Sequence, residues 1–279
     1  MIEENGARSN GKLRHGAADP GRYGLHAARL EDALCAGETA MKILSIALLC
    51  AVVCATAAAQ QAPDIPRFSA AKSGVPPPEW KPVSLASFKS NTDYMTVVED
   101  GAVVVRATAH NAASLLAVQT DFDPHHFPLL SWRWKVVQGI PAANSADQAK
   151  EDAPVRVMVA FAGDTSKLAF KERFAASAAQ TISGQQLPYA TLMYIWGSKV
   201  ALDSITVSSR SSRVRMLAVA VDDQGIGKWQ TYKRNLVEDF KRAFGEEPGN
   251  VTSIEIMTDT DNTGADAQAY YGDVSVSAK

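Results

Sequence analysis

Short runs of alternating apolar and polar residues constrain this chain more than any other feature of its sequence. A period of two is typical of a β-strand with one buried and one exposed face, because successive side chains point to opposite sides. Few segments of helical period separate the runs, so we predict a mainly β protein, an antiparallel β-sandwich of jelly-roll type. The expected strands cover residues 94–99, 103–108, 114–119, 130–137, 155–161, 191–196, 214–221, 228–234, 254–259 and 270–276.

Two short helices are expected between the strands. The first covers residues 167–179, where apolar side chains recur every four residues after a capping segment at 164–166. The second begins at Asn235, which forms a capping box with Glu238, and ends before Gly245.

The N-terminal region predicts export. Residues 1–40 have mixed charge and no sustained period, which indicates a disordered or non-native extension. Met41 then opens a signal peptide, with Lys42 as its basic start, an apolar run over 43–55 and a cleavage site near Ala59. This run is shorter than the roughly 18 residues of a membrane span, so we expect no stable membrane anchor after cleavage. The expected location is the periplasm or the cell exterior.

The remaining chain divides into a proline-rich lead-in, residues 60–79, and a single domain, residues 80–279. All three cysteines precede the expected cleavage site, so disulfides, thiol nucleophiles and thiolate metal ligands are excluded from the mature chain. The formal net charge of −2 argues against a nucleic-acid partner.

An acidic loop between the last two expected strands is the first candidate site. Residues 243–278 contain acidic side chains but no lysine or arginine, so their charge must be balanced from elsewhere. Calcium would suit the loop oxygens, and the candidate ligands are Asp259, Asp261, Asn262 and, if its strand folds back, Asp273. Two alternatives stay open: the side chains cap turns through backbone hydrogen bonds, or Arg234 and its neighbours neutralise the loop.

Aromatic and basic side chains form the second set of candidates. Trp132 and Trp134 share one face of a strand, a pattern more typical of a core than of a ligand platform. Trp196 lies at a strand end beside a glycine, where an open platform for a sugar ring is expected. The other candidate ligand-binding residues are Arg210, Arg234 and Tyr270.

Several sequence blocks resemble a known family. SWRWKV at 131–136, YIWG at 194–197, IMTDTDNTG at 256–264 and AYYGDV at 269–274 are similar to the bacterial secreted family called domain of unknown function 3047. The resemblance covers about residues 80–277. It implies an exported β-sandwich, broadly similar to carbohydrate-binding jelly rolls, and it supplies no catalytic residues.

These observations favour an exported, non-catalytic domain that binds a polar envelope or extracellular ligand, with a saccharide as the foremost choice. The first alternative is a glycan-active enzyme that uses acidic residues of the terminal loop, with Asp239 or Asp222 as the opposing carboxylate. The second is a structural or partner-binding envelope protein. The sequence after residue 60 contains no nucleophile elbow, zinc-protease motif or phosphate-binding glycine loop that would name a reaction.

Overall fold

The computed structural model describes residues 61–279 except 171, 173–187, 222 and 224. Contacts divide the chain into residues 1–59 and 60–279, and the described residues all lie in the second unit. The expected extension and signal peptide are therefore outside the described residues, as is most of the helix expected at 167–179. None of the helices that the structure describes is long and apolar enough to cross a membrane.

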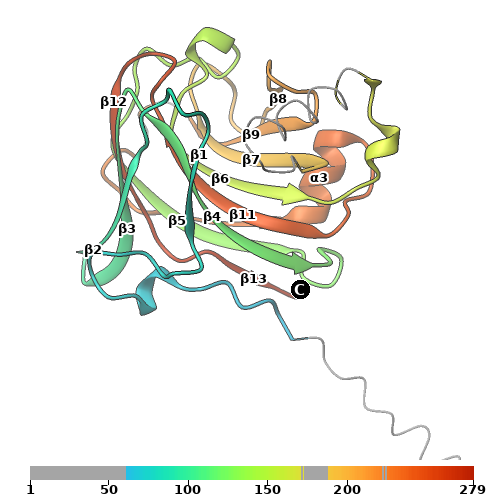
Figure 1. Ribbon diagram of the computed structural model, residues 1–279, viewed down its shortest axis with the longest axis horizontal. Coiled ribbons are helices and arrows are strands. Elements are labelled where there is room, and N and C mark those ends of the chain that lie inside the picture. The colour runs from blue at the N-terminus through green and yellow to red at the C-terminus, as the bar shows by residue number, and fades with distance from the viewer. Residues whose placement is uncertain (1–60, 171, 173–187, 222, 224) are drawn as a thin grey trace, which may run out of the picture. The chain divides into compact units, whose positions relative to one another are not determined.

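Two sheets make up the domain (Figure 1). Within the described part of the chain, all strand pairs are antiparallel except β7 with β9, which confirms a mainly β fold built from antiparallel sheets. The seven-stranded sheet has the order β1 (Lys81–Ser84), β4 (Ala113–Phe122), β11 (Val251–Asp259), β6 (Ala153–Phe161), β7 (Ala190–Gly197), β9 (Val214–Val221) and β8 (Ile205–Val207). The six-stranded sheet has the order β10 (Gln230–Asn235), β5 (Leu129–Gln138), β12 (Asp266–Tyr271), β3 (Ala102–His110) and β2 (Asp93–Glu99), with β13 (Ser275–Ser277) also paired to β5.

An aromatic core joins the two sheets. Trp132 and Trp134 of β5 are almost fully buried, so the prediction that they belong to the core is confirmed. The ring of Trp132 lies 4.9 Å from that of Tyr194 on β7, which belongs to the other sheet. Tyr232 of β10 packs against both tryptophan rings, at 5.2 and 5.0 Å between centroids. The inward faces of the two sheets therefore bury large rings against one another, and this apolar burial stabilises the fold.

The opposite face of the seven-stranded sheet carries a second apolar cluster. Its members are contributed by neighbouring strands, and β6 and β7 are consequently buried on both faces. A strand buried on both sides has no exposed face to occupy with polar residues, so its sequence need not alternate. The cluster includes Met158, Met193, Ile195, Met216 and Met257.

A single α-helix, α3 (Leu236–Phe244), lies among the described residues, and Figure 1 shows it at one end of the domain near β9. The Asn235 side chain accepts hydrogen bonds from the backbone N–H groups of Val237 and Glu238, as expected of its cap. Gly245 ends the helix with φ 73°, a left-handed conformation that favours glycine. Short 3-10 turns complete the described elements: η1 (Phe68–Ala70), η2 (Gln148–Lys150) and η3 (Thr165–Lys167).

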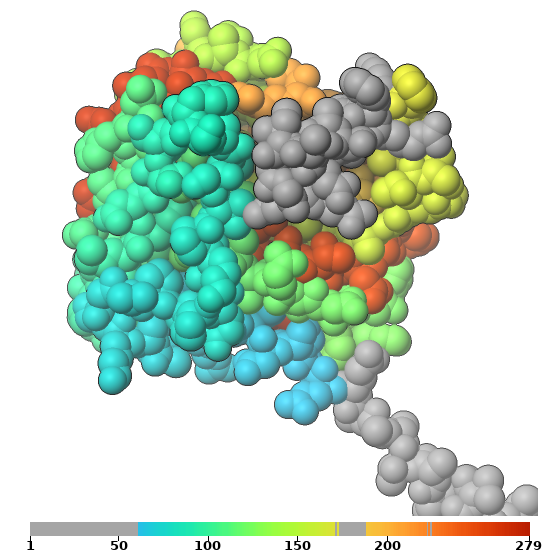
Figure 2. Space-filling model, in the orientation of Figure 1, coloured from blue at the N-terminus to red at the C-terminus, as the bar shows by residue number. Residues whose placement is uncertain are grey.

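The proline-rich lead-in is part of the packed domain. Phe68 is fully buried, and its ring lies 4.6 Å from that of Trp80. The Trp80 indole N–H donates to the carbonyl oxygen of Pro66 at 2.8 Å. Figure 2 shows the blue residues that follow position 60 lying against the teal and green part of the domain. The sequence indicated only an extended connection here, because proline and small residues hide the two apolar anchors, Ile65 and Phe68.

Candidate functional site

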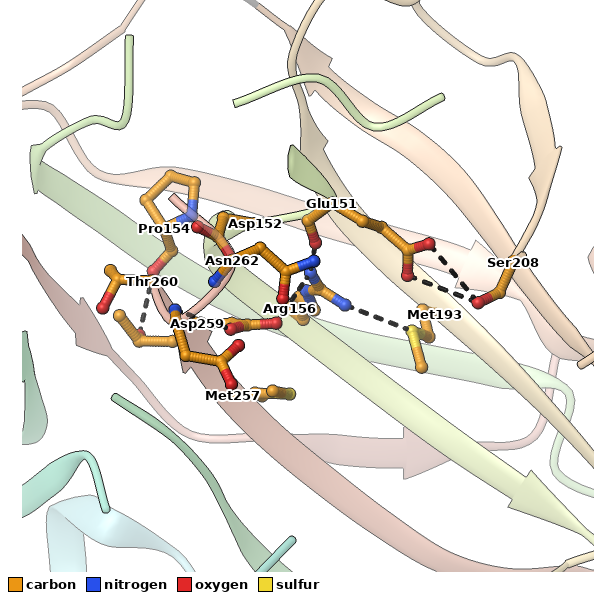
Figure 3. Close-up of polar contacts among 12 residues, drawn as sticks. Glu151, Asp152, Pro154, Arg156, Met193, Ser208, Met257, Asp259, Thr260 and Asn262 are labelled. Atoms are coloured by element: carbon orange, nitrogen blue, oxygen red, sulfur yellow. Dashed lines mark hydrogen bonds and ion pairs between the residues drawn. The ribbon is translucent and has the colours of Figure 1, made fainter. Parts of the chain in front are cut away.

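The acidic loop after β11 is tied down by a carboxylate that precedes β6 (Figure 3). Asp152 is buried and accepts hydrogen bonds from the backbone N–H groups of Asn262 at 3.1 Å and Thr263 at 2.8 Å. It also accepts one from the Thr263 hydroxyl at 2.6 Å. Because three donors of the loop converge on this carboxylate, Asp152 fixes the turn. The sequence had predicted that side chains of the loop itself would accept these hydrogen bonds.

Among the residues that the structure describes, three cations balance this loop. Arg156 Nη2 lies 3.1 Å from Asp259 Oδ2, and Lys89 Nζ pairs with Asp261. The third, Arg210, donates to the Asn262 side-chain oxygen at 3.2 Å. The negative charge is therefore neutralised by basic side chains of the protein, which was one of the two alternatives left open by the sequence.

The prediction that Arg234 supplies the positive charge was wrong. Arg234 instead donates to the Asp239 carboxylate at 2.8 Å and pairs with Asp203 at 3.2 Å, so it anchors the start of α3. The actual partners of the loop, Lys89 and Arg156, precede it by long stretches of chain. The pairing of strands brings these two residues to the loop, and no local sequence pattern reveals their contact with it.

Charge and burial shift the pKa values of two neighbouring carboxyl groups in opposite directions. Burial raises the pKa of Asp259 to about 7, against the opposing effect of Arg156, and the charges of Asp152 and Asp261 raise it further. Burial would also raise the pKa of Asp261, but hydrogen bonds from Lys89 and Asp259 hold it below its usual value. At neutral pH Asp261 is thus the firmly ionised member of the pair.

The calcium ligands expected from the sequence do not all converge. Oxygens of Asp152, Asp259 and Asp261 lie within 4.8 Å of one another, so Asp152 takes the place expected for Asp273. Asp273 instead accepts hydrogen bonds from the backbone N–H and hydroxyl of Ser69, at 2.9 and 2.6 Å. Asn262 donates its amide to the Gln148 carbonyl at 2.6 Å. Three oxygen ligands fit a hard cation, but Lys89 and Arg156 already pair with two of them. Calcium stays a prediction with a revised ligand set, and we expect it to bind where this competition is removed.

The carboxylates proposed for glycan cleavage are engaged in structural contacts. Asp239 is buried and bound to Arg234 and to the Tyr194 hydroxyl, and Asp222 is outside the described residues. Asp152 does come close to Asp259 and Asp261, with oxygens within 4.8 Å of one another, which is shorter than the roughly 5–9.5 Å between carboxyl groups that such chemistry uses. Its oxygens, moreover, already accept three hydrogen bonds from the loop.

Trp196 is not an open platform. It is 4% exposed and points into the core between the sheets, as do Leu192 and Tyr194 of the same strand. The sequence placed it on the surface because a glycine follows it, but β7 is buried on both faces. A buried ring cannot stack on a ligand, which removes Trp196 from the candidate site.

Tyr270 lies on the outer face of the six-stranded sheet, which we define as the face turned away from the core. The ring is half-buried and lies 6.5 Å from that of Trp229, which precedes β10. The Arg133 guanidinium lies 4.5 Å from the Trp229 centroid, and Lys135 Nζ lies 5.4 Å from the Tyr270 centroid. Lys135 is itself paired with Glu99 and Asp100.

A polar groove of about 440 Å³ continues this outer face across β12, β3 and β2. The Gln268 amide donates to the Tyr270 hydroxyl at 3.3 Å, which joins the groove to the aromatic pair. The groove and the two rings together are called the outer-face groove below. The groove is lined by Asn91, Asp93, Arg106, Thr108, His110 and Gln268.

Sequence reasoning selected Tyr270 from this surface and missed the rest. A usable signal was present in the alternation of β10, because Trp229 and Thr231 have the opposite parity to the inward-facing Tyr232. The polar residues of β3 and β12 gave no such signal, since their meeting depends on strand order and register.

These features define a mainly β domain of two packed sheets, with a charge-balanced loop at one position and an open polar groove at another. The chain belongs to the family described as protein of unknown function (DUF3047), whose model matches residues 78–275. This confirms the family resemblance found in the sequence. No curated protein matches the chain.

Solved structures show distant similarity. The K3 cleaved adhesin domain of Lys-gingipain from Porphyromonas gingivalis W83 is 10% identical, with a TM-score of 0.37 over 78% of this chain and 100% of that one. A family 30 carbohydrate binding module is 11% identical, with a TM-score of 0.38 over 77% of this chain and 87% of the module. A cellulase derived from Cel12A of Rhodothermus marinus is 12% identical, with a TM-score of 0.38 over 75% and 98% of the two chains. These similarities are too distant to carry an argument about ligand or activity.

Proposed function

We propose that this protein is an exported, non-catalytic binding protein of jelly-roll type whose ligand is a saccharide held in the outer-face groove. The observation that carries the proposal is the juxtaposition of Tyr270 and Trp229 with a groove of polar side chains. A sugar ring presents a C–H face that packs on an aromatic ring and hydroxyl groups that need donors and acceptors. The groove offers amide, hydroxyl, carboxylate, imidazole and guanidinium groups within one surface.

Export rests on the signal-peptide pattern of residues 41–59. N-terminal sequencing of protein recovered from the periplasm or medium tests it, and the expected first residue is Gln60. Recovery of the protein only from the cytoplasm, with residues 41–59 intact, would contradict export.

Calorimetric titration of the mature chain with neutral and acidic oligosaccharides tests the binding function. Tyr270→Ala and Trp229→Ala are expected to weaken binding by about tenfold each, because each removes an aromatic contact surface. Phe88→Ala is the matched control, since its ring is 86% exposed and lines no part of the groove. Absence of binding to every oligosaccharide of the panel would overturn the saccharide proposal and favour the structural or partner-binding alternative.

A glycan-active enzyme is the second candidate function. It is favoured by the opposite pKa shifts of Asp259 and Asp261, a pattern seen in acid–base pairs. We expect no release of reducing sugar from oligosaccharides by the mature chain, because the neighbouring Asp152 is committed to the loop. Release that disappears in Asp261→Asn would establish the enzyme instead.

A further inference from the structure

Two arginines on the outer face of the six-stranded sheet lack a carboxylate partner. Arg106 of β3 and Arg133 of β5 form no ion pair with any residue that the structure describes. Lys135 lies on the same face but is neutralised by Glu99 and Asp100. The outer face therefore presents two arginines that form no ion pair within the described chain, beside the rings of Tyr270 and Trp229, with the Asp100 carboxylate near Arg133.

Arg106 has a donor that the fold leaves unused. Its Nε is buried and has no hydrogen-bond partner among the described residues, and Nη2 meets only the Met95 sulfur, at 3.9 Å. The fold thus leaves much of the hydrogen-bonding capacity of this guanidinium unused. Because Nε itself is shielded from solvent, a ligand reaches the guanidinium through its Nη groups. Arg106 lines the groove and lies directly opposite Tyr270 in the β3–β12 ladder.

Arg133 is held in place by its surroundings. Its side chain lies over Gly272, where a Cβ atom would come within 2.6 Å of the arginine Cγ and Nε atoms. The guanidinium stacks beside Trp229. A planar guanidinium fixed in this way loses little freedom when it binds a carboxylate through two parallel hydrogen bonds.

We infer that the saccharide of the outer-face groove carries carboxylate groups, and that Arg106 and Arg133 receive them. This inference rests on the proposed saccharide function. β12 separates the two strands and the arginines are offset by two residues, so their Cα atoms lie about 12 Å apart. The two side chains also extend away from each other, Arg106 toward Met95 on β2 and Arg133 toward Trp229 beside β10. One sugar ring therefore does not meet both guanidinium groups, which makes the ligand an oligosaccharide of uronic acid type. Asp93 lines the groove, and Asp266 pairs with His110 at 2.7 Å. Because these protein carboxylates repel a negative ligand, the carboxylate of the sugar is directed to the Arg106 part of the groove.

The test compares two forms of one ligand: oligogalacturonate and its fully methyl-esterified derivative, which keeps the backbone and removes the charge. Calorimetry on the mature chain is expected to give at least about tenfold tighter binding of the free acid, since charge-assisted hydrogen bonds are worth roughly 1.5–3 kcal/mol. Its affinity is expected to fall as salt rises. A sulfated oligosaccharide serves as the third arm and is expected to bind less tightly than the carboxylate.

Variants locate the site. Arg106→Gln and Arg133→Gln are each expected to reduce the preference for the acid form, while Arg210→Gln removes the same charge at the acidic loop and keeps the preference. Melting curves verify that each variant is folded, and two independent arginine variants keep the test valid if one of them unfolds.

Each result has a defined meaning. Equal affinity for the acid and the ester would overturn the inference and leave the proposed function standing, whereas failure to bind any oligosaccharide, neutral or acidic, would overturn both. Tighter binding of the sulfated ligand would overturn the inference of a carboxylate and show that the arginines bind sulfate groups. Loss of the preference in Arg210→Gln alone would move the site to the acidic loop.

Discussion

Arg156 and Asp259 form an ion pair inside the protein, with Nη2 and Oδ2 3.1 Å apart and side chains that are 4% and 9% exposed. The two residues come from β6 and the end of β11, adjacent strands of the seven-stranded sheet. Neither charge is accessible to bulk water, so each depends on the other for compensation. This pair links the acidic loop to the sheet.

Removing one member of the pair is expected to destabilise the protein strongly. Arg156→Met leaves Asp259 buried without its partner, and the carboxyl, whose pKa is already about 7, then takes up a proton. At pH 8.5 we therefore expect a loss of about 2 kcal/mol in the free energy of unfolding. Urea denaturation measures it, with Lys81→Met on the exposed strand β1 as the control. A loss below about 1 kcal/mol would show that the pair is solvated rather than buried.

The stability contributed by Asp259 is expected to depend on pH. Its folded pKa of about 7 lies above its ordinary value of 3.8, so the folded state binds more protons than the unfolded state between these values. Stability is then lost as the pH rises through this window, by up to roughly 1.4 kcal/mol for each pH unit. The free energy of unfolding of the wild type minus that of Asp259→Asn should therefore be larger at pH 4.5 than at pH 7.5, and the opposite trend would refute the raised pKa.

Calcium and Lys89 are expected to compete for the acidic loop. Lys89 pairs with Asp261, so millimolar calcium should leave the melting temperature of the wild type unchanged. Lys89→Met removes this cation and leaves the Asp152, Asp259 and Asp261 oxygens within 4.8 Å of one another. Calcium should then raise the melting temperature by about 2–4 °C, if binding contributes about 1 kcal/mol.

Differential scanning calorimetry with and without calcium measures this change, and magnesium provides the ion control because it demands a stricter octahedral geometry. A calcium-dependent shift already present in the wild type would show that Lys89 does not occupy the position of the ion.

The fold was predictable wherever one face of a strand meets the core. In β5, Trp132 and Trp134 alternate with Arg133 and Lys135, and the structure places the two pairs on opposite faces. The same reasoning failed in β7, because both of its faces are buried and Trp196 shares its strand with apolar residues on the other face. Alternation reports burial on one side of a strand, so it loses its meaning in the middle of a covered sheet.

The candidate sites were predictable only as far as their interactions are local. The cap of α3 at Asn235 depends on residues two and three positions away, and the sequence predicted it. The ion pairs of Asp259 and Asp261 depend on β6 and on the loop after β1, and their register is decided by the packing of the sheet. Tyr270 could be proposed from its strand, whereas its neighbour Arg106 became visible only from the pairing of β3 with β12.

Removing the N-terminal cap of α3 is expected to lower the stability of the protein by the amount of a single local interaction. Asn235→Ala removes the acceptor for the N–H groups of Val237 and Glu238, at 3.1 and 3.3 Å, and should cost about 1 kcal/mol. Asn235→Asp keeps an acceptor at the same position and should lose less. Urea denaturation compares the two variants, and equal losses would show that the amide donor to Glu238 matters more than the cap.

The lead-in is expected to contribute to stability as a part of the core. Phe68 is fully buried against Trp80, and the neighbouring Ser69 binds the Asp273 carboxylate, so residues 66–80 connect the start of the domain to its last strands. Phe68→Ala should lower the free energy of unfolding by about 3–5 kcal/mol, because it leaves a cavity of aromatic size. Val75→Ala is the control from the same segment, since Val75 is 74% exposed. If Phe68→Ala and Val75→Ala unfold at the same urea concentration as the wild type, the lead-in does not belong to the cooperative core, and the domain would begin near Trp80 as the sequence indicated.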